Sequence, residues 1–129
     1  MRVCGANLAY QMQTSQQTTG NIGENLAAQL LITMGYRIVA RNLRQGRAEI
    51  DLVAEHGPFL VFIEVKTRTS ATFQQPEEAV TDHKRQKMQQ AMDDYLQLNP
   101  WPGPVRYDVV SMILLPDGYK ARIFKDAIS

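Results

Sequence analysis

The chain has 129 residues, of which 44% are hydrophobic and 21% charged, a composition typical of a globular domain. Its net charge of +1 does not by itself indicate a nucleic-acid-binding protein. With a single cysteine, Cys4, the chain cannot form an intrachain disulfide or a cysteine zinc cluster, and no apolar run approaches the roughly 18 residues of a membrane span. We therefore expect a single-domain cytoplasmic protein with no membrane partner.

The N-terminal region changes character near residue 20. Residues 1–20 are rich in Gln, Ser and Thr without sustained periodicity, which predicts a mobile arm, so that residues 21–129 form the domain. From about Asn21 the apolar spacing predicts a helix that ends before Gly35. Glu24 lies at the margin of its apolar arc and could reach a sheet edge, although the helix dipole alone explains an acid in a first turn.

Three strands are expected next, over residues 36–43, 49–55 and 60–66. A turn at residues 44–47 joins the first two, and Gly57 and Pro58 join the second to the third as a tight antiparallel hairpin.

Charged residues follow an apolar run in the third of these strands. Alternation places Glu64 and Lys66 on one face, about 6.6 Å apart, and a two-residue turn places Asp51 on the same face. Two carboxylates beside a lysine suit a divalent cation, whereas the simpler alternative is a surface ion pair worth about 0 to 1 kcal/mol. The apolar run predicts a strand buried on both faces, where charges are seldom placed without a partner or a metal.

The C-terminal half predicts a polar loop at residues 67–76, a helix from Thr81 or Asp82 to Leu98, a stiff linker at 99–104, and strands at 105–115 and 119–124. Apolar spacing within the helix predicts a buried stripe formed by Met88, Ala91, Met92 and Tyr95.

Basic residues form two clusters, and either cluster could simply be a solvated face. The first contains Arg37, Arg41, Arg44, Arg47, Lys66 and Arg68, and the second contains Lys84, Arg85 and Lys87. The second cluster opens the later helix, where the dipole disfavours cations, so either a bound phosphate or a neighbouring acid such as Glu77, Glu78 or Asp82 would offset the cost. His56 and His83 lack metal-ligand spacing and are expected to be surface residues.

Several short motifs occur together along this chain. They are Gly23-Glu24, Gly35-Tyr36, Glu49-Ile50-Asp51-Leu52-Val53, Glu64-Val65-Lys66-Thr67-Arg68, Ala79-Val80, Lys84 and Tyr107-Asp108-Val109-Val110. From about Gly20 to its end the chain resembles the YraN-like family, a bacterial group of restriction-endonuclease-like proteins similar to archaeal Holliday-junction resolvases. The resemblance implies an α/β fold with an α-β-β-β-α-β core, a mixed central sheet and an extra C-terminal strand.

The resemblance also implies a site of the PD-(D/E)xK type. Its catalytic residues would be Asp51, Glu64 and Lys66, with Mg²⁺ or Mn²⁺ held by Glu24, Asp51, Glu64 and Val65. DNA would be bound by Arg47, Arg68, Lys84 and Arg85. The function implied is a metal-dependent endonuclease acting on branched or structured DNA, and the alternative is a non-catalytic nucleic-acid-binding or protein-interaction module with the same fold. A homodimer is compatible with the sequence, which does not decide the oligomeric state.

Overall fold

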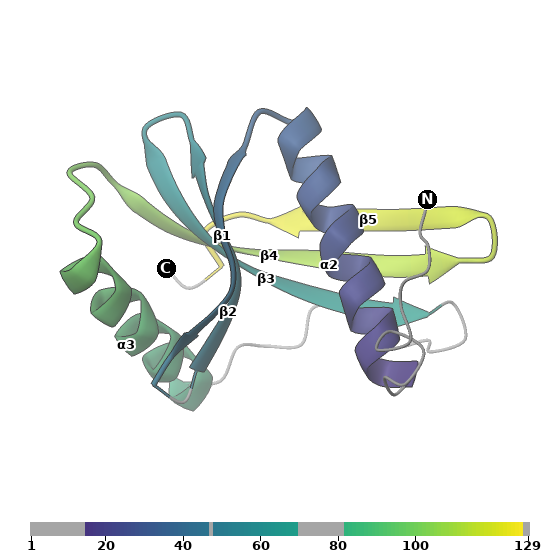
Figure 1. The fold of residues 1–129 in the computed structure, drawn as a ribbon, viewed down its shortest axis with the longest axis horizontal. Coiled ribbons are helices and arrows are strands. Elements are labelled where there is room, and N and C mark those ends of the chain that lie inside the picture. Colours follow the sequence, from purple (N-terminus) through teal and green to yellow (C-terminus); the bar gives the residue numbers. More distant parts are fainter. Residues whose placement is uncertain (1–14, 47, 70–81, 128–129) are drawn as a thin grey trace.

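The computed structural model describes residues 15–46, 48–69 and 82–127, with side chains from residue 19 onward. Its elements, in chain order, are α2 (Ser15–Thr33), β1 (Arg37–Gln45), β2 (Ala48–His56), β3 (Phe59–Thr69), α3 (Asp82–Leu98), β4 (Val105–Leu115) and β5 (Gly118–Phe124) (Figure 1). Arg47 and the segment at residues 70–81 lie outside the described residues, as do residues 1–14 of the expected N-terminal arm.

The strands form one five-stranded sheet in the order β1-β2-β3-β4-β5. β3 and β4 are parallel, whereas β1–β2, β2–β3 and β4–β5 are antiparallel pairs. A parallel pair needs a long crossover, and the segment that contains α3 supplies it. The predicted α-β-β-β-α-β core with a mixed sheet and an extra C-terminal strand is therefore confirmed.

The helices cover opposite faces of the sheet. The alternate residues of β3 show this, since they belong to two different core clusters. Val61 and Ile63 pack in the cluster that contains Ala27 and Leu31 of α2. Phe62 packs in the other cluster, with Met88, Ala91 and Met92 of α3, and its ring forms a T-shaped pair with the Tyr95 ring at a centroid distance of 5.5 Å. β3 is thus buried on both faces over residues 60–63, as the apolar run predicted.

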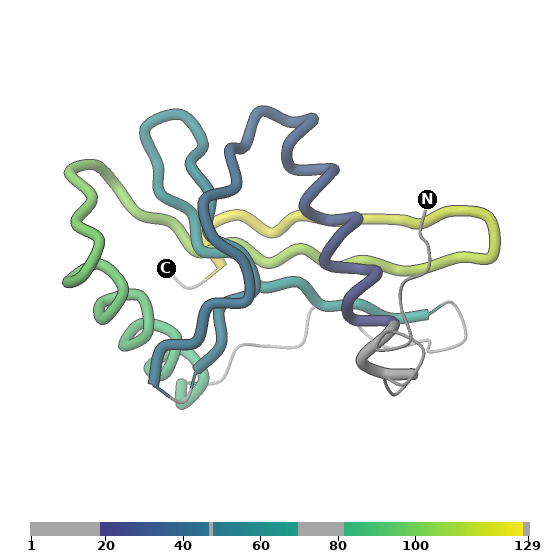
Figure 2. The backbone as a smooth tube through the Cα atoms, in the orientation of Figure 1, coloured from purple at the N-terminus to yellow at the C-terminus, as the bar shows by residue number. Residues whose placement is uncertain are grey.

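The β1–β2 pair bends strongly, and Figure 2 shows both strands curving away from the straighter β4–β5 pair. Part of the bend follows an irregularity in β1 between Ile38 and Ala40, which pair with the adjacent residues Ala54 and Val53. This curvature carries the start of β2 towards the first turns of α3.

Some element boundaries differ from the sequence prediction. α2 begins at Ser15, six residues before Asn21, because a nucleated helix can extend through Ser, Thr and Gln residues even where the sequence carries no apolar pattern. β3 continues through Thr69, where a polar loop was expected, because residues up to Thr69 pair with β4. α3 spans Asp82–Leu98 as predicted.

A buried polar cluster lies near the hairpin that joins β2 to β3. Asp108 is 1% exposed and accepts hydrogen bonds from Nε of Arg106 at 2.9 Å and from its Nη2 at 3.0 Å. The same Nη2 donates to the Tyr36 hydroxyl at 3.0 Å, and the Tyr36 ring stacks on His56 at a centroid distance of 3.9 Å. Asp108 also accepts from the backbone N–H of Asp126 at 3.0 Å, which fixes the segment after β5.

Neither of the helices in the described part of the chain combines the length and the apolar character needed to cross a membrane.

Candidate active site

The candidate site begins where β2 and β3 separate. Their pairing runs from His56↔Phe59 to Leu52↔Ile63, the register that the two-residue turn predicted. One step further Asp51 lies level with Glu64, and there the Oδ2 atom of Asp51 accepts a hydrogen bond from the backbone N–H of Val65 at 2.8 Å. The Asp51 carboxylate therefore takes the place of a backbone acceptor in the gap between the strands.

Glu64 is held by two different partners. Its Oε1 atom accepts a hydrogen bond from the hydroxyl of Tyr107, a β4 residue that is 3% exposed. Its Oε2 atom lies 3.2 Å from the Nζ atom of Lys84 in the first turn of α3. Glu64 thus joins β3, β4 and α3 at one point.

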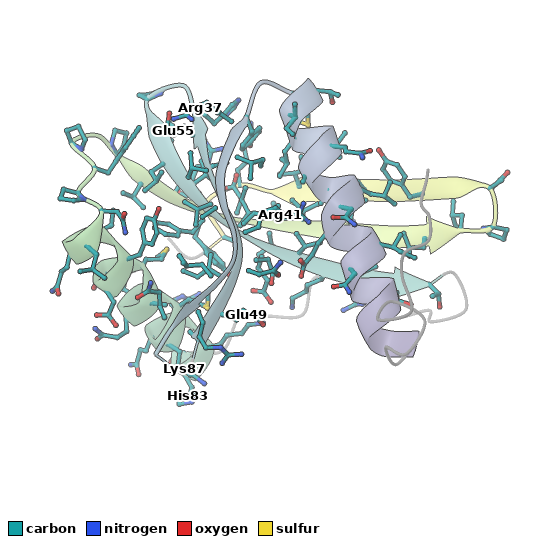
Figure 3. The ribbon with its side chains drawn as sticks, viewed as in Figure 1. Arg37, Arg41, Glu49, Glu55, His83 and Lys87 are labelled. Atoms are coloured by element: carbon teal, nitrogen blue, oxygen red, sulfur yellow. The ribbon has the colours of Figure 1, made fainter. Side chains whose placement is uncertain are left out.

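A cavity of about 460 Å³ opens beside these two carboxylates. It is lined by Ala48, Glu49, Asp51, Glu64, His83, Lys84, Lys87 and Met88. One wall, from β2 and β3, carries the acids, and the other wall, from α3, carries the basic side chains. In Figure 3 the labelled Glu49, His83 and Lys87 lie together at this end of the molecule.

Glu24 reaches the same region from α2. The close approach of this helix to the sheet depends on Gly23, since a Cβ atom there would lie 1.9 Å from Oγ1 of Thr67. Burial raises the pKa of Glu24, the Arg41 guanidinium lowers it, the Glu49 carboxylate raises it, and a hydrogen bond with Asp51 lowers it. A hydrogen bond lowers the pKa of the carboxylate that accepts it, so the lowering is expected if the protonated Asp51 carboxyl donates this hydrogen bond to Glu24.

Asp51 is the most strongly perturbed of these acids. Burial raises its pKa from 3.8 to about 7; the Val65 N–H opposes the rise, and the charges of Glu24, Glu64 and Glu49 add to it. Near neutral pH the Asp51 carboxyl is therefore close to half protonated, which relieves part of the repulsion among the carboxylates.

The chemistry of these donors fits a hard divalent cation, which prefers carboxylate and carbonyl oxygens. Asp51 and Glu64 bring two carboxylates to the gap. Because the N–H and C=O groups of one strand residue point to the same side, the Val65 carbonyl opens to this gap as well. Over residues 15–46, 48–69 and 82–127, no three His, Cys, Asp or Glu side chains are already grouped as metal ligands. The Lys84 ammonium, 3.2 Å from Oε2 of Glu64, balances part of the negative charge.

The structure places the other predicted residues in different surroundings. Lys66 lies two residues beyond Glu64 on β3, level with Ser111, and Arg68 lies level with Ile113. Neither belongs to the lining of the cavity. Arg85 pairs with Asp82 at 3.3 Å, which is the neighbouring-acid explanation offered for this cluster.

Four contributors to the site were not assigned to it from the sequence: Glu49, His83, Lys87 and Tyr107. His83 was expected to be only a surface residue; it is exposed, and it also lines the cavity. Tyr107 carried a usable signal, since a tyrosine on a buried strand needs a partner for its hydroxyl.

Comparison with known proteins identifies relatives over most of the chain. A UPF0102 protein of Symbiobacterium thermophilum is 44% identical over 110 residues, covering 84% of this chain and 93% of that protein. A UPF0102 protein of Caldanaerobacter subterraneus is 38% identical over 111 residues, covering 81% and 87%. Among solved structures, a repair endonuclease from Pyrococcus abyssi is similar, with 15% identity and a TM-score of 0.42, covering 82% of this chain and 41% of that one.

The family assignment rests on the sequence. Residues 23–112 match the description "Uncharacterised protein family UPF0102", and this range includes Glu24, Asp51, Glu64 and Tyr107. The resemblance to the YraN-like family is thereby confirmed. The chain belongs to the UPF0102 family.

Proposed function

We propose that this protein is a metal-dependent DNA endonuclease that hydrolyses phosphodiester bonds in branched or structured DNA. The observation that carries the proposal is the convergence of Asp51 and Glu64 on the gap between β2 and β3, facing the basic wall of α3 across the cavity. Carboxylates on one wall and cations on the other suit a cation and a phosphate bound side by side. The preference for branched DNA follows from the family resemblance.

Each residue would have a distinct part in the reaction. Asp51, Glu64 and the Val65 carbonyl would hold Mg²⁺ or Mn²⁺, with Glu24 supporting Asp51 from α2. The ion, when bound, would stabilise the charge that develops on the phosphate. Lys66 would orient or activate a water molecule, whose oxygen forms a bond to phosphorus while the bond to the leaving sugar oxygen breaks. The water gives up a proton and the leaving oxygen gains one.

Cleavage of labelled DNA junctions, flaps and duplexes with Mg²⁺ or Mn²⁺ tests the proposal. Lys66→Met should abolish cleavage while metal binding measured by calorimetry persists, whereas Asp51→Ala should lose both, since only the carboxylate supplies a ligand. Equal loss of metal binding by Lys66→Met would contradict these roles. Lys120→Met, at an exposed position of β5, is the matched control and should behave as the parent.

A second candidate function is a non-catalytic module that binds nucleic acid or a protein partner. It is favoured by the engagement of both Glu64 oxygens, one with Tyr107 and the other with Lys84. This candidate predicts DNA binding of the same strength with and without divalent cations, and no cleavage of any DNA form.

A further inference from the structure

We propose that Lys84 is a phosphate-binding residue that, in the free protein, occupies the Glu64 oxygen needed by the divalent cation, so that DNA and the cation bind cooperatively. This inference rests on the proposed nuclease function and adds a coupling between its two ligands. It is drawn from the unequal surroundings of the two Glu64 oxygens.

One of those oxygens is fixed in place. The Tyr107 hydroxyl donates a hydrogen bond to Oε1. The Tyr107 ring packs in the core cluster with Phe62 and Met88. This packing holds the ring in place, so the hydroxyl stays directed at Oε1. Tyr107 is therefore a positioning residue, which keeps the Glu64 carboxylate at the mouth of the gap.

The other oxygen has an exchangeable partner. The Lys84 side chain is 39% exposed and that of Glu64 is 22% exposed, and both line the cavity. An ion pair between partly exposed groups contributes at most about 1 kcal/mol, so a stronger ligand for either group can open it. The long, flexible lysine stem lets the ammonium move while α3 stays packed.

The surroundings of Lys84 show where its ammonium can go. His83 and Lys87 line the same cavity from the first two turns of α3. A phosphate diester entering the cavity is repelled by Glu49, Asp51 and Glu64 and attracted by this basic wall. Lys84 is the cation of that wall already in contact with the acids, so its release to the phosphate frees Glu64 at the same moment.

The exchange makes binding of the two ligands interdependent. While Lys84 contacts Oε2, its positive charge opposes a cation at Glu64, and Glu64 draws Lys84 away from DNA. After the exchange, Glu64 contacts the cation and Lys84 contacts the phosphate. Each ligand then strengthens the other by the same factor, as thermodynamic linkage requires.

The test uses Lys84→Met and two separate measurements that should change in opposite directions. Without DNA, calorimetry should show that Lys84→Met binds Mn²⁺ roughly three- to tenfold more tightly than the parent, because one repelling charge is gone. In chelator, fluorescence anisotropy should show weaker binding of a labelled four-way DNA junction, with a slope of log affinity against log salt shallower by about one unit. A residue with a purely structural role would not produce opposite signs.

Two variants serve as controls. Lys120→Met removes the same charge at an exposed position of β5 and should change neither measurement. Lys84→Arg keeps the charge and should hold Mn²⁺ affinity near that of the parent.

Contrary results separate this inference from the proposed function. If the parent and Lys84→Met bind Mn²⁺ equally, the coupling is wrong while the metal site stands. If Lys84→Met binds Mn²⁺ more tightly but junction affinity and salt slope are unchanged, Lys84 does not bind phosphate and the inference also fails. If the parent binds no Mn²⁺ in either the presence or the absence of DNA, both the inference and the proposed function are wrong.

Discussion

Replacing Asp51 by Asn should stabilise the metal-free protein at alkaline pH. The asparagine oxygen can accept the Val65 N–H bond that Asp51 accepts at 2.8 Å, and its amide can donate to Glu24 as a protonated Asp51 would. Asn thus reproduces the neutral form of Asp51 and removes the charge that Glu24, Glu64 and Glu49 repel.

The magnitude follows from the pKa. Folding raises the Asp51 pKa from 3.8 to about 7, so the neutral form is favoured in the folded protein. The stability that this provides is complete below pH 3.8 and is lost as the pH rises through 7. The shift is about three units, each worth about 1.36 kcal/mol, which gives an upper value of roughly 4 kcal/mol and about 2 to 4 kcal/mol after partial solvation. Asp51→Asn has no ionisable group at this position, so its unfolding free energy should not fall in this way as the pH rises.

Urea denaturation in chelator at pH 4 and pH 8 measures the difference. Parent and Asp51→Asn should have similar unfolding free energies at pH 4, and the variant should be about 2 to 4 kcal/mol more stable at pH 8. Millimolar Mg²⁺ at pH 8 should then stabilise the parent only, since a ligand bound by the folded state alone adds stability by mass action. Asp93→Asn, an exposed change on α3, is the control and should show no pH-dependent difference.

The opposite outcome would refute the reasoning. If Asp51 is instead one partner of a stabilising ion pair, Asp51→Asn should destabilise the protein at pH 8 and Mg²⁺ should leave both denaturation curves in place.

Three further predictions concern the remaining features of the structure. Gly23→Ala should lower the unfolding free energy by about 1 to 3 kcal/mol despite the better helix propensity of Ala, because its Cβ would overlap Thr67; an unchanged urea midpoint would show that α2 can move away. Arg106→Met should cost about 3 to 5 kcal/mol in the same assay because it leaves Asp108 charged and buried, and a loss below 1 kcal/mol would argue against a buried ion pair. Mn²⁺ affinity should rise from pH 6 to pH 8 as Asp51 loses its proton, with release of a proton seen as a buffer-dependent binding enthalpy; a flat profile would exclude Asp51 as a ligand.

The features that the sequence predicted well are local ones. Gly57 and Pro58 form a two-residue turn, which sets the parity of the β2–β3 register and hence the shared face of Asp51 and Glu64. The helical spacing of apolar residues and the start at Asp82 likewise predicted where α3 begins and ends.

The features that the sequence did not predict depend on docking between distant segments. The contact of Lys84 with Glu64 is set by the position of α3 against the sheet, which no spacing within the helix specifies. The contact of Tyr107 with Glu64 requires the register of a parallel pair joined by a long crossover. The approach of Glu24 to Asp51 was implied by the family resemblance alone, since the helix dipole offered an equally good reason for an acid there.

The parallel β3–β4 pair also has a consequence for how the molecule folds. The β1–β2–β3 segment and the β4–β5 hairpin each join strands that are neighbours in sequence, so both can form early. Pairing of Leu60 with Val105 closes a much longer loop and must follow, at a greater entropic cost. Glu64 belongs to β3 and Tyr107 to β4, so Tyr107 can orient the Glu64 carboxylate only once these two strands have paired. During refolding, backbone amide protection should therefore appear in the β2–β3 hairpin before the candidate site can bind a cation, a sequence of events that pulsed hydrogen exchange can follow.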